Sequence, residues 1–222
     1  VAPKSRLKSR VGFSLLDHGL TQREALYEMH YCILCHTRNN DTCSKGFPKQ
    51  KQKYKDGFKL NASDYELIGC PLEQKISEMN QLMQSGFAIA ALAMVMVDNP
   101  LVPLTGQRIC NDCSQACIYQ KQSPVDVPQA ETAISRAVLA LPYGVEIYSL
   151  LLRWNPLRQS FARQVDDNGR RVLVMGMGPA GIAMAREMLQ AGYGVVAMDG
   201  LLLQPFFSLS LPYNHKAMGC LV

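Results

Sequence analysis

The sequence predicts a mainly α-helical N-terminal domain, residues 1–165, followed by a partial α/β unit of strand–helix–strand type in residues 170–222. Three observations support this prediction. Apolar residues recur at helical spacing between residues 21 and 154, seven of the eight cysteines fall in two groups, and a glycine-rich turn near residue 176 joins a short apolar strand to a helix. With 48% hydrophobic and 18% charged residues, the chain can build a sizeable core.

The helices expected in the first domain have local sequence signals. Thr21 followed by Glu24 is a capping-box pattern, which predicts a helix that begins at Gln22. Methionines in the later helical stripe are expected to fill the core. Apolar spacing and flanking proline or glycine residues predict further helices over residues 76–83, 87–97, 132–141 and 145–154.

The net charge of +5 arises near the N-terminus, because Lys and Arg outnumber Asp and Glu by 12 to 5 in residues 1–60. We interpret this excess as a solvated surface rather than a docking face, and no nucleic-acid-binding motif surrounds the basic residues 45–59, so no nucleic acid is expected as a partner. No apolar run reaches the roughly 18 residues of a membrane span, and no signal peptide is evident. The expected location is cytoplasmic.

The cysteines are the most informative residues. In a reducing cytosol thiols stay free, and clustered thiols there are more often metal ligands or redox groups than disulfides. Two residues between cysteines let both sulfurs face one metal, and thiolates suit zinc or iron–sulfur clusters. The seven grouped cysteines are Cys32, Cys35, Cys43, Cys70, Cys110, Cys113 and Cys117.

Two kinds of metal site are compatible with this spacing. The pairs Cys32/Cys35 and Cys110/Cys113 could share one zinc ion, in a zinc-stabilised interaction module with a vestigial nucleotide-binding fold. That alternative leaves the three other grouped cysteines without a role, which favours more than four ligand positions. Seven thiolates are one short of two four-ligand clusters, so either one ligand is not cysteine or Cys220 takes part.

Four stretches of this sequence together resemble a known family. They are CILC at 32–35, GCPLEQKISEMNQLMQSG at 69–86, TGQRICNDCSQACI at 105–118 and PVDVPQAE at 124–131. Residues 28–135 resemble the helical ferredoxin domain with two clusters that begins the glutamate synthase small subunit and dihydropyrimidine dehydrogenase.

The resemblance implies how the ligands divide between two [4Fe–4S] clusters. In the family, the eighth ligand is a Glu or Gln that lies seven residues after a proline. Counted from Pro124, this position in the chain is Glu131. The first implied ligand set is Cys32, Cys35, Cys43 and Cys117, and the second is Cys70, Cys110, Cys113 and Glu131. The chain departs from the family in a wider gap before Cys43, a tighter gap between Cys110 and Cys113, and a basic insertion at 44–68. Insertions in surface loops cost little stability.

A nucleotide-binding fingerprint begins the second domain. Residues 171–175 form a predicted strand, and G-x-G-x-x-G follows directly at 176–181. A second predicted strand at 195–198 is followed at once by the acidic residue Asp199. In a Rossmann-type βαβ unit these glycines allow a tight turn, the approach of a pyrophosphate and the packing of helix on strand. The GPAG form resembles the FAD-binding unit of the same family. The residues expected to bind FAD are Gly176, Gly178, Pro179, Ala180, Gly181 and Asp199.

The two parts together imply an FAD- and iron–sulfur-dependent NAD(P)H oxidoreductase. This chain is expected to be its electron-transfer module, which passes electrons between flavin and the two clusters, and no residue is predicted to act as an acid–base catalyst. Residues 170–222 are fewer than the hundred or so of a complete dinucleotide domain. We therefore expect a truncated FAD-binding unit in a fragment that is not self-sufficient. Its expected partners are the remaining FAD and NAD(P)H domains or a redox partner subunit.

Overall fold

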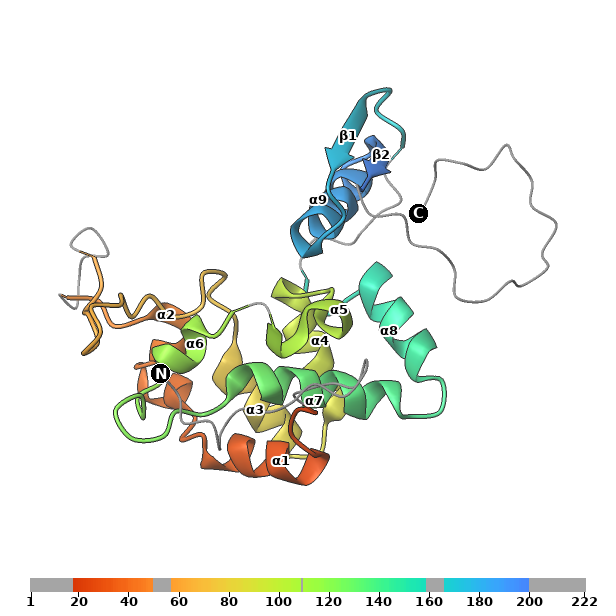
Figure 1. The fold of residues 1–222 in the computed structure, drawn as a ribbon. Coiled ribbons are helices and arrows are strands. Elements are labelled where there is room, and N and C mark those ends of the chain that lie inside the picture. Colours follow the sequence, from red (N-terminus) through yellow and green to blue (C-terminus); the bar gives the residue numbers. More distant parts are fainter. Residues whose placement is uncertain (1–17, 50–56, 109, 159–165, 200–222) are drawn as a thin grey trace, which may run out of the picture. The chain divides into compact units, whose positions relative to one another are not determined.

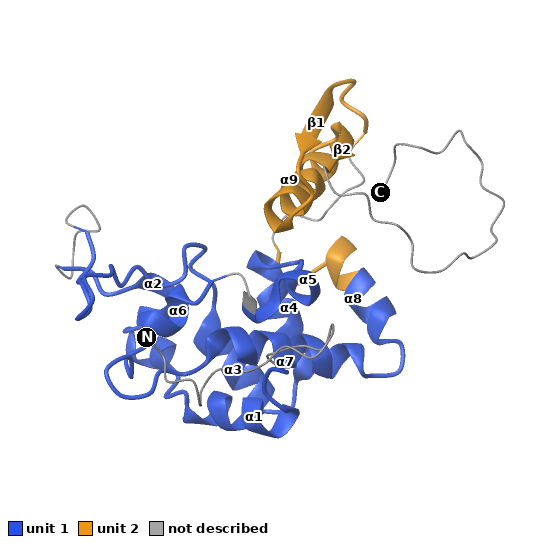
Figure 2. Ribbon diagram, viewed as in Figure 1, with its two compact units in different colours: residues 1–149 blue, residues 150–222 orange. Residues whose placement is uncertain are grey.

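The computed structural model describes residues 18–49, 57–108, 110–158 and 166–199 (Figure 1). The chain divides into two compact units, residues 1–149 and 150–222 (Figure 2). The first is helical, and the second contains a two-stranded parallel sheet. Cys220 and the tail after residue 199 lie outside the described residues.

The first unit is built from helices joined by loops that carry the cysteines. The longer helices are α1 (Gln22–Tyr31), α3 (Ile76–Gln84), α4 (Ala88–Asp98), α7 (Val127–Leu139) and α8 (Gly144–Arg153), the last of which crosses into the second unit. The short helices are η2 (Cys35–Arg38), α2 (Thr42–Lys45), α5 (Val102–Thr105), η4 (Gly106–Arg108) and α6 (Asp112–Gln115).

Helix α1 begins with the capping box that the sequence predicts. The backbone N–H of Glu24 donates to the hydroxyl oxygen of Thr21 at 3.3 Å, and the Glu24 carboxylate accepts from the Thr21 N–H at 2.8 Å. Two of the free N–H groups at the start of the helix are thereby satisfied. The helix ends next to Cys32, whose N–H still bonds to the carbonyl oxygens of Glu28 and Met29.

Helix α7 is the central element of the first unit. It packs against α1, α3, α4, α5 and α6, which surround it in Figure 1. Met29 of α1, Met79 of α3, Leu92 of α4 and Ile134 of α7 are completely buried. The prediction that methionines fill this core is confirmed, and unbranched, flexible side chains suit such an irregular interior.

Two of the predicted helices differ from the structure at their starts. Helix α7 begins at Val127 rather than residue 132, because Asp126 caps it by accepting the N–H of Gln129 at 3.2 Å and Pro128 lies in its first turn. The helix predicted over 87–97 is α4, which begins at Ala88, while Phe87 precedes its first turn and is 61% exposed. The earlier start of α7 brings residue 131 into the helix.

The basic insertion at 44–68 forms a loop within the first unit, and its Tyr65 hydroxyl donates to the Asp112 carboxylate of α6 at 2.6 Å. Its described part forms antiparallel bridges, Pro48 with Phe58 and Leu60 with Glu66. At the base of this excursion Gly69 has a φ of +73°, and a Cβ there would overlap the backbone nitrogen of Gly46. Such close approach and left-handed geometry require glycine. The ends of the insertion are therefore in contact.

The second unit is a strand–helix–strand unit. Strands β1 (Arg171–Met175) and β2 (Gly194–Met198) pair in parallel, with Arg171 opposite Gly194, and α9 (Pro179–Gln190) connects them. Val174 of β1 and Ala185 of α9 are buried where helix and sheet pack. The predicted order of strand, glycine turn, helix and strand is confirmed.

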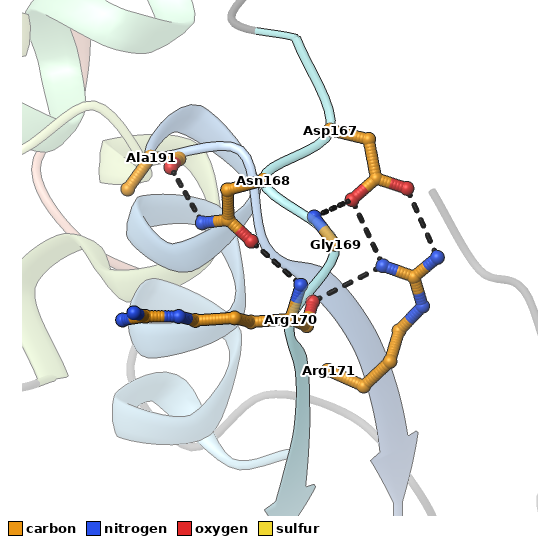
Figure 3. Close-up of polar contacts among 6 residues, drawn as sticks. All are labelled: Asp167, Asn168, Gly169, Arg170, Arg171 and Ala191. Atoms are coloured by element: carbon orange, nitrogen blue, oxygen red, sulfur yellow. Dashed lines mark hydrogen bonds and ion pairs between the residues drawn. The ribbon is translucent and has the colours of Figure 1, made fainter.

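Polar contacts tie the segment before β1 to the end of α9 (Figure 3). The guanidinium of Arg171 donates to both carboxylate oxygens of Asp167 at 2.9 Å. The Asn168 side chain accepts the N–H of Arg170 at 2.9 Å and donates to the carbonyl oxygen of Ala191 at 3.3 Å. These bonds join the polar segment expected to link the two domains to the sheet that follows it.

In the described ranges, no single helix is long and apolar enough to cross a membrane. Helices α7 and α8 pass by length and composition only as a pair, bent by 115°.

Candidate functional site

Four cysteines from three segments of the first unit line one pocket. Cys32, Cys35, Cys43 and Cys117 all contribute to the wall of this pocket. These are the four cysteines of the first ligand set. Apolar residues complete much of the wall, namely Ile33, Ile76, Ile118, Val125 and Val127.

Local backbone geometry places these cysteines. Cys32 caps the C-terminus of α1, and Leu34 then adopts a left-handed conformation with a φ of 53°, which reverses the chain before η2 begins at Cys35. Cys43 lies within α2, and Cys117 follows α6. The end of α1 and the short helices η2, α2 and α6 thus carry the four thiols.

The pocket disfavours free thiolates. Burial raises the pKa of Cys35 and of Cys43, and the neighbouring Cys32 and Cys117 raise both pKa values further. The Asp41 carboxylate also raises the pKa of Cys43 and accepts a hydrogen bond from its Sγ at 3.4 Å. Thiols crowded in this way ionise readily only beside a positive charge, and a bound metal supplies such a charge.

Two buried polar side chains in the same wall have atoms without a partner. Asn80 is completely buried and Thr42 is 4% exposed. The amide atoms of Asn80 and the hydroxyl of Thr42 find no hydrogen-bond partner in the described part of the chain. Unpaired buried polar atoms are costly, so their place beside the thiols fits a polar occupant of the pocket.

The second ligand set also lies together. The pKa of Cys113 is raised by burial first and then by Glu131, Cys70 and Cys110, so the four groups are within electrostatic reach of one another. Cys70 likewise has its pKa raised by burial and by Glu131 and Cys110, while backbone N–H groups of Leu72 and Gln74 lower it. Cys113 is buried and Cys110 is exposed, which places this group near the surface.

Glu131 is buried in α7, with only 8% of its surface exposed. Burial raises its pKa from 4.5 to about 7, although hydrogen bonds from the side chains of Gln74 and Asn99 oppose the rise. A carboxyl in this environment differs from an ordinary surface glutamate, which would titrate near 4.5.

The thiols do not gather around a single point. Among the described residues, no three His, Cys, Asp or Glu side chains are grouped closely enough to hold one metal ion. This finding applies to the Cys32/Cys35 and Cys110/Cys113 pairs of the zinc alternative and to both cluster ligand sets alike. In a [4Fe–4S] cluster each ligand binds a different iron atom, so the ligands surround a volume, as the cysteines of the pocket do.

The glycine turn of the second unit has the geometry expected from its sequence. Gly176 has a φ of +93°, and a Cβ at Gly181 would overlap the carbonyl oxygen of Gly176, so helix and strand approach closely there. Gly178 precedes α9, and the position of its missing Cβ is open, with nothing within 4 Å. Pro179 and Ala180 form the exposed first turn of that helix. The free N–H groups at this helix start are available to an anion.

Asp199 contacts the same turn. Its carboxylate accepts the backbone N–H of Met177 at 2.6 Å. This bond joins the end of β2 to the glycine turn that follows β1. The expected role of Asp199 in binding FAD stays a prediction.

Sequence reasoning missed Asn80 and Thr42. Asn80 lies four residues after Ile76 and three before Met83, on the buried stripe of α3. A polar residue within such a stripe is the signal that could have identified it. Thr42 directly precedes Cys43 and has no comparable signal.

The fold and the cysteine arrangement define a mainly helical, cysteine-rich protein with a short parallel strand–helix–strand unit. No family model matches the chain. An uncharacterized protein of Rickettsia prowazekii, RP006, is 48% identical over 113 residues, which are 50% of this chain and 16% of that protein. The glutamate synthase (NADH) of Schizosaccharomyces pombe is 33% identical over 138 residues, 62% of this chain and 6% of that protein. The glutamate synthase (NADPH) small chain of Mycobacterium tuberculosis is 28% identical over 132 residues, 59% of this chain and 24% of that protein.

The chain is thus distantly similar to glutamate synthases. It spans less than a third of the length of these relatives. The similarity indicates a function related to redox chemistry.

Proposed function

We propose that this chain is the electron-transfer module of an FAD- and iron–sulfur-dependent NAD(P)H oxidoreductase of the glutamate synthase small-chain type. In this proposal residues 1–165 form a helical ferredoxin-like domain with two [4Fe–4S] clusters. Residues 170–222 form part of a Rossmann-type unit that binds FAD. The remaining FAD and NAD(P)H domains, or a redox partner subunit, complete the enzyme.

The observation that carries the proposal is the pocket lined by Cys32, Cys35, Cys43 and Cys117. Cys117 is far from the other three in the sequence, yet four thiols and two polar side chains unpartnered among the described residues line one space. Burial raises the pKa of Cys35 and of Cys43, so these thiols lose their protons readily only beside a positive charge such as a bound metal supplies. Soft thiolate ligands suit iron–sulfur clusters.

The second cluster is assigned to Cys70, Cys110, Cys113 and Glu131. Their mutual electrostatic effects support this grouping. A carboxylate ligand adds negative charge where a thiolate is missing, and the burial of Glu131 keeps water away from that position. The zinc alternative leaves Cys43, Cys70 and Cys117 without a role.

The FAD assignment rests on the glycine turn. The open Gly178 allows a pyrophosphate to approach the backbone, and the N-terminus of α9 offers N–H groups and partial positive charge. When bound, flavin and clusters supply the electron-transfer chemistry. The chain's own residues bind these groups, exclude water from them and adjust their charge.

The proposal is tested by measuring iron, acid-labile sulfide, zinc and flavin in protein purified without oxygen. We expect a brown protein with about eight irons per chain, as two four-iron clusters require. A colourless protein with about one zinc would overturn the proposal. Flavin is measured separately, because the clusters can be present while the FAD site is incomplete.

Glu131 is tested on its own. A Glu131→Ala variant is expected to lose the iron of one cluster, about four per chain, and to keep the other. A Glu146→Ala variant, which removes an exposed glutamate outside both ligand sets, is the control and should keep about eight. A Glu131→Ala protein with both clusters intact would contradict this ligand assignment alone.

A further inference from the structure

The side chain of Asn80 is completely buried in the wall of the cysteine pocket. Neither its amide nitrogen nor its amide oxygen has a hydrogen-bond partner among the described residues. An amide offers two N–H donors, and leaving them unpaired in an apolar wall costs roughly 1–3 kcal/mol. A partner inside the pocket would remove this cost.

Thr42 repeats the pattern from a different element. It lies in α2, beside Cys43, is 4% exposed and lines the same pocket. Its hydroxyl also has no partner in the described ranges. Ser77 provides a contrast, because it is equally buried in the wall but its hydroxyl donates to Asp41 at 3.3 Å.

We propose that Asn80 and Thr42 donate hydrogen bonds to the sulfur atoms of the cluster held in this pocket and raise its reduction potential. This inference rests on the proposed function, since it requires the cluster to be present. The rest of the wall is largely apolar. Asn80 and Thr42 have side-chain donors in this wall that find no partner among the described residues. They are positioning residues, because they act on the charge of the cluster and not on a substrate.

One hydrogen bond to a pocket sulfur is already formed. The backbone N–H of Tyr119 donates to the Sγ of Cys117 at 3.5 Å. Sulfur in this wall therefore accepts N–H donors without a change of fold. Bonds from Asn80 and Thr42 would add side-chain donors on α3 and α2.

The sign of the effect follows from charge. A cluster that takes up one electron becomes more negative, and a hydrogen-bond donor stabilises the more negative state more strongly. Removing a donor therefore disfavours the reduced cluster and lowers the potential.

The test is an EPR-monitored redox titration of the anaerobic protein. Asn80→Leu and Thr42→Val remove the donors with little change of side-chain volume. Thr42→Ser keeps the hydroxyl and removes only the methyl group. The signal from this pocket is the one that a Cys117→Ser variant lacks. At a fixed ambient potential, each donor removal should lower the ratio of reduced to oxidised cluster about tenfold, which is about 59 mV for a one-electron couple.

Ser77→Ala is the matched control, because its hydroxyl is already bonded to Asp41. We expect it and Thr42→Ser to stay near the wild-type potential. Unchanged potentials in Asn80→Leu and Thr42→Val proteins that retain full iron would overturn this inference and leave the proposed function standing. If Asn80→Leu loses its cluster, the reduction potentials of Thr42→Val and Thr42→Ser test the inference: equal potentials in these two variants would overturn it. A wild-type protein without iron would overturn the proposed function itself.

Discussion

The backbone N–H of Cys70 donates a hydrogen bond to the carbonyl oxygen of Cys43 at 2.8 Å. The two residues belong to different proposed ligand sets, and the basic insertion lies between them in the sequence. The contact between Gly46 and Gly69 closes the insertion just beyond this bond. The insertion therefore does not separate Cys43 from Cys70 in space.

Gly69 is predicted to be essential to this closure. Gly69→Ala should reduce the free energy of unfolding by about 2–4 kcal/mol, because the new Cβ meets backbone at a left-handed position. Gly86 is the matched control, with a φ of +83° and nothing within 4 Å. Gly86→Ala should cost only about 1 kcal/mol. Chemical denaturation followed by circular dichroism measures both, and equal losses would contradict the closure.

Glu131 is predicted to make metal-free protein less stable as the pH rises. Its folded-state pKa is raised to about 7 from 4.5, so the folded state holds its proton more tightly than the unfolded state does. The contribution of Glu131 to the free energy of unfolding is fully present below pH 4.5 and is lost as the pH rises through 7. The loss is on the order of 3 kcal/mol.

Glu131→Gln removes this titration while keeping a buried polar side chain. The stability of the variant relative to wild type should therefore increase between pH 4.5 and 7, as measured by urea denaturation of metal-free protein. Parallel pH profiles for the two proteins would show that residue 131 does not titrate in this range.

Gly178 is predicted to matter for FAD and not for folding. Its backbone has an ordinary φ of −68° and open space at the Cβ position, so Gly178→Ala should change stability by less than about 0.5 kcal/mol. The methyl group would stand where a pyrophosphate approaches, and FAD affinity should fall about tenfold. Flavin fluorescence titration measures this change.

Gly181 is the contrasting position in the same turn. A Cβ at residue 181 overlaps the carbonyl oxygen of Gly176, so Gly181→Ala should destabilise the protein by roughly 1–3 kcal/mol. An undiminished FAD affinity in Gly178→Ala would count against flavin binding at this turn.

Asp41 is predicted to oppose electron uptake in the cysteine pocket. Its carboxylate lies 3.4 Å from the Sγ of Cys43, and negative charge there disfavours a more negative cluster. Asp41→Asn should raise the reduction potential by the equivalent of roughly 1 kcal/mol. Asp64→Asn, which removes the same charge from an exposed turn, is the control and should have little effect. A redox titration that gives both variants the same potential would exclude this role.

Local signals in the sequence account for much of the fold. Thr21 and Glu24 lie three residues apart and contact each other directly, so the start of α1 follows from neighbouring residues. The glycines at 176–181 likewise act within one turn, and the strand–helix–strand order follows from them. The start of α7 was missed because Asp126 and Pro128 were not recognised as an N-terminal signal.

The site was harder to predict from the sequence than the fold, because it depends on contacts between distant segments. Spacing alone allowed Cys32 and Cys35 to pair with Cys110 and Cys113 on zinc, and only the family resemblance suggested Cys117 as their neighbour. Asn80 could be recognised as a polar residue on an apolar stripe, but only packing places it beside thiols.

The most direct test of the central claim is the iron content of a Cys117→Ser variant purified without oxygen. The account predicts about four irons per chain, against about eight in wild type and in a Cys220→Ser control. The remaining iron should belong to the cluster of Cys70, Cys110, Cys113 and Glu131. A Cys117→Ser protein that keeps the full iron content of wild type would contradict the convergence of these cysteines on one cluster.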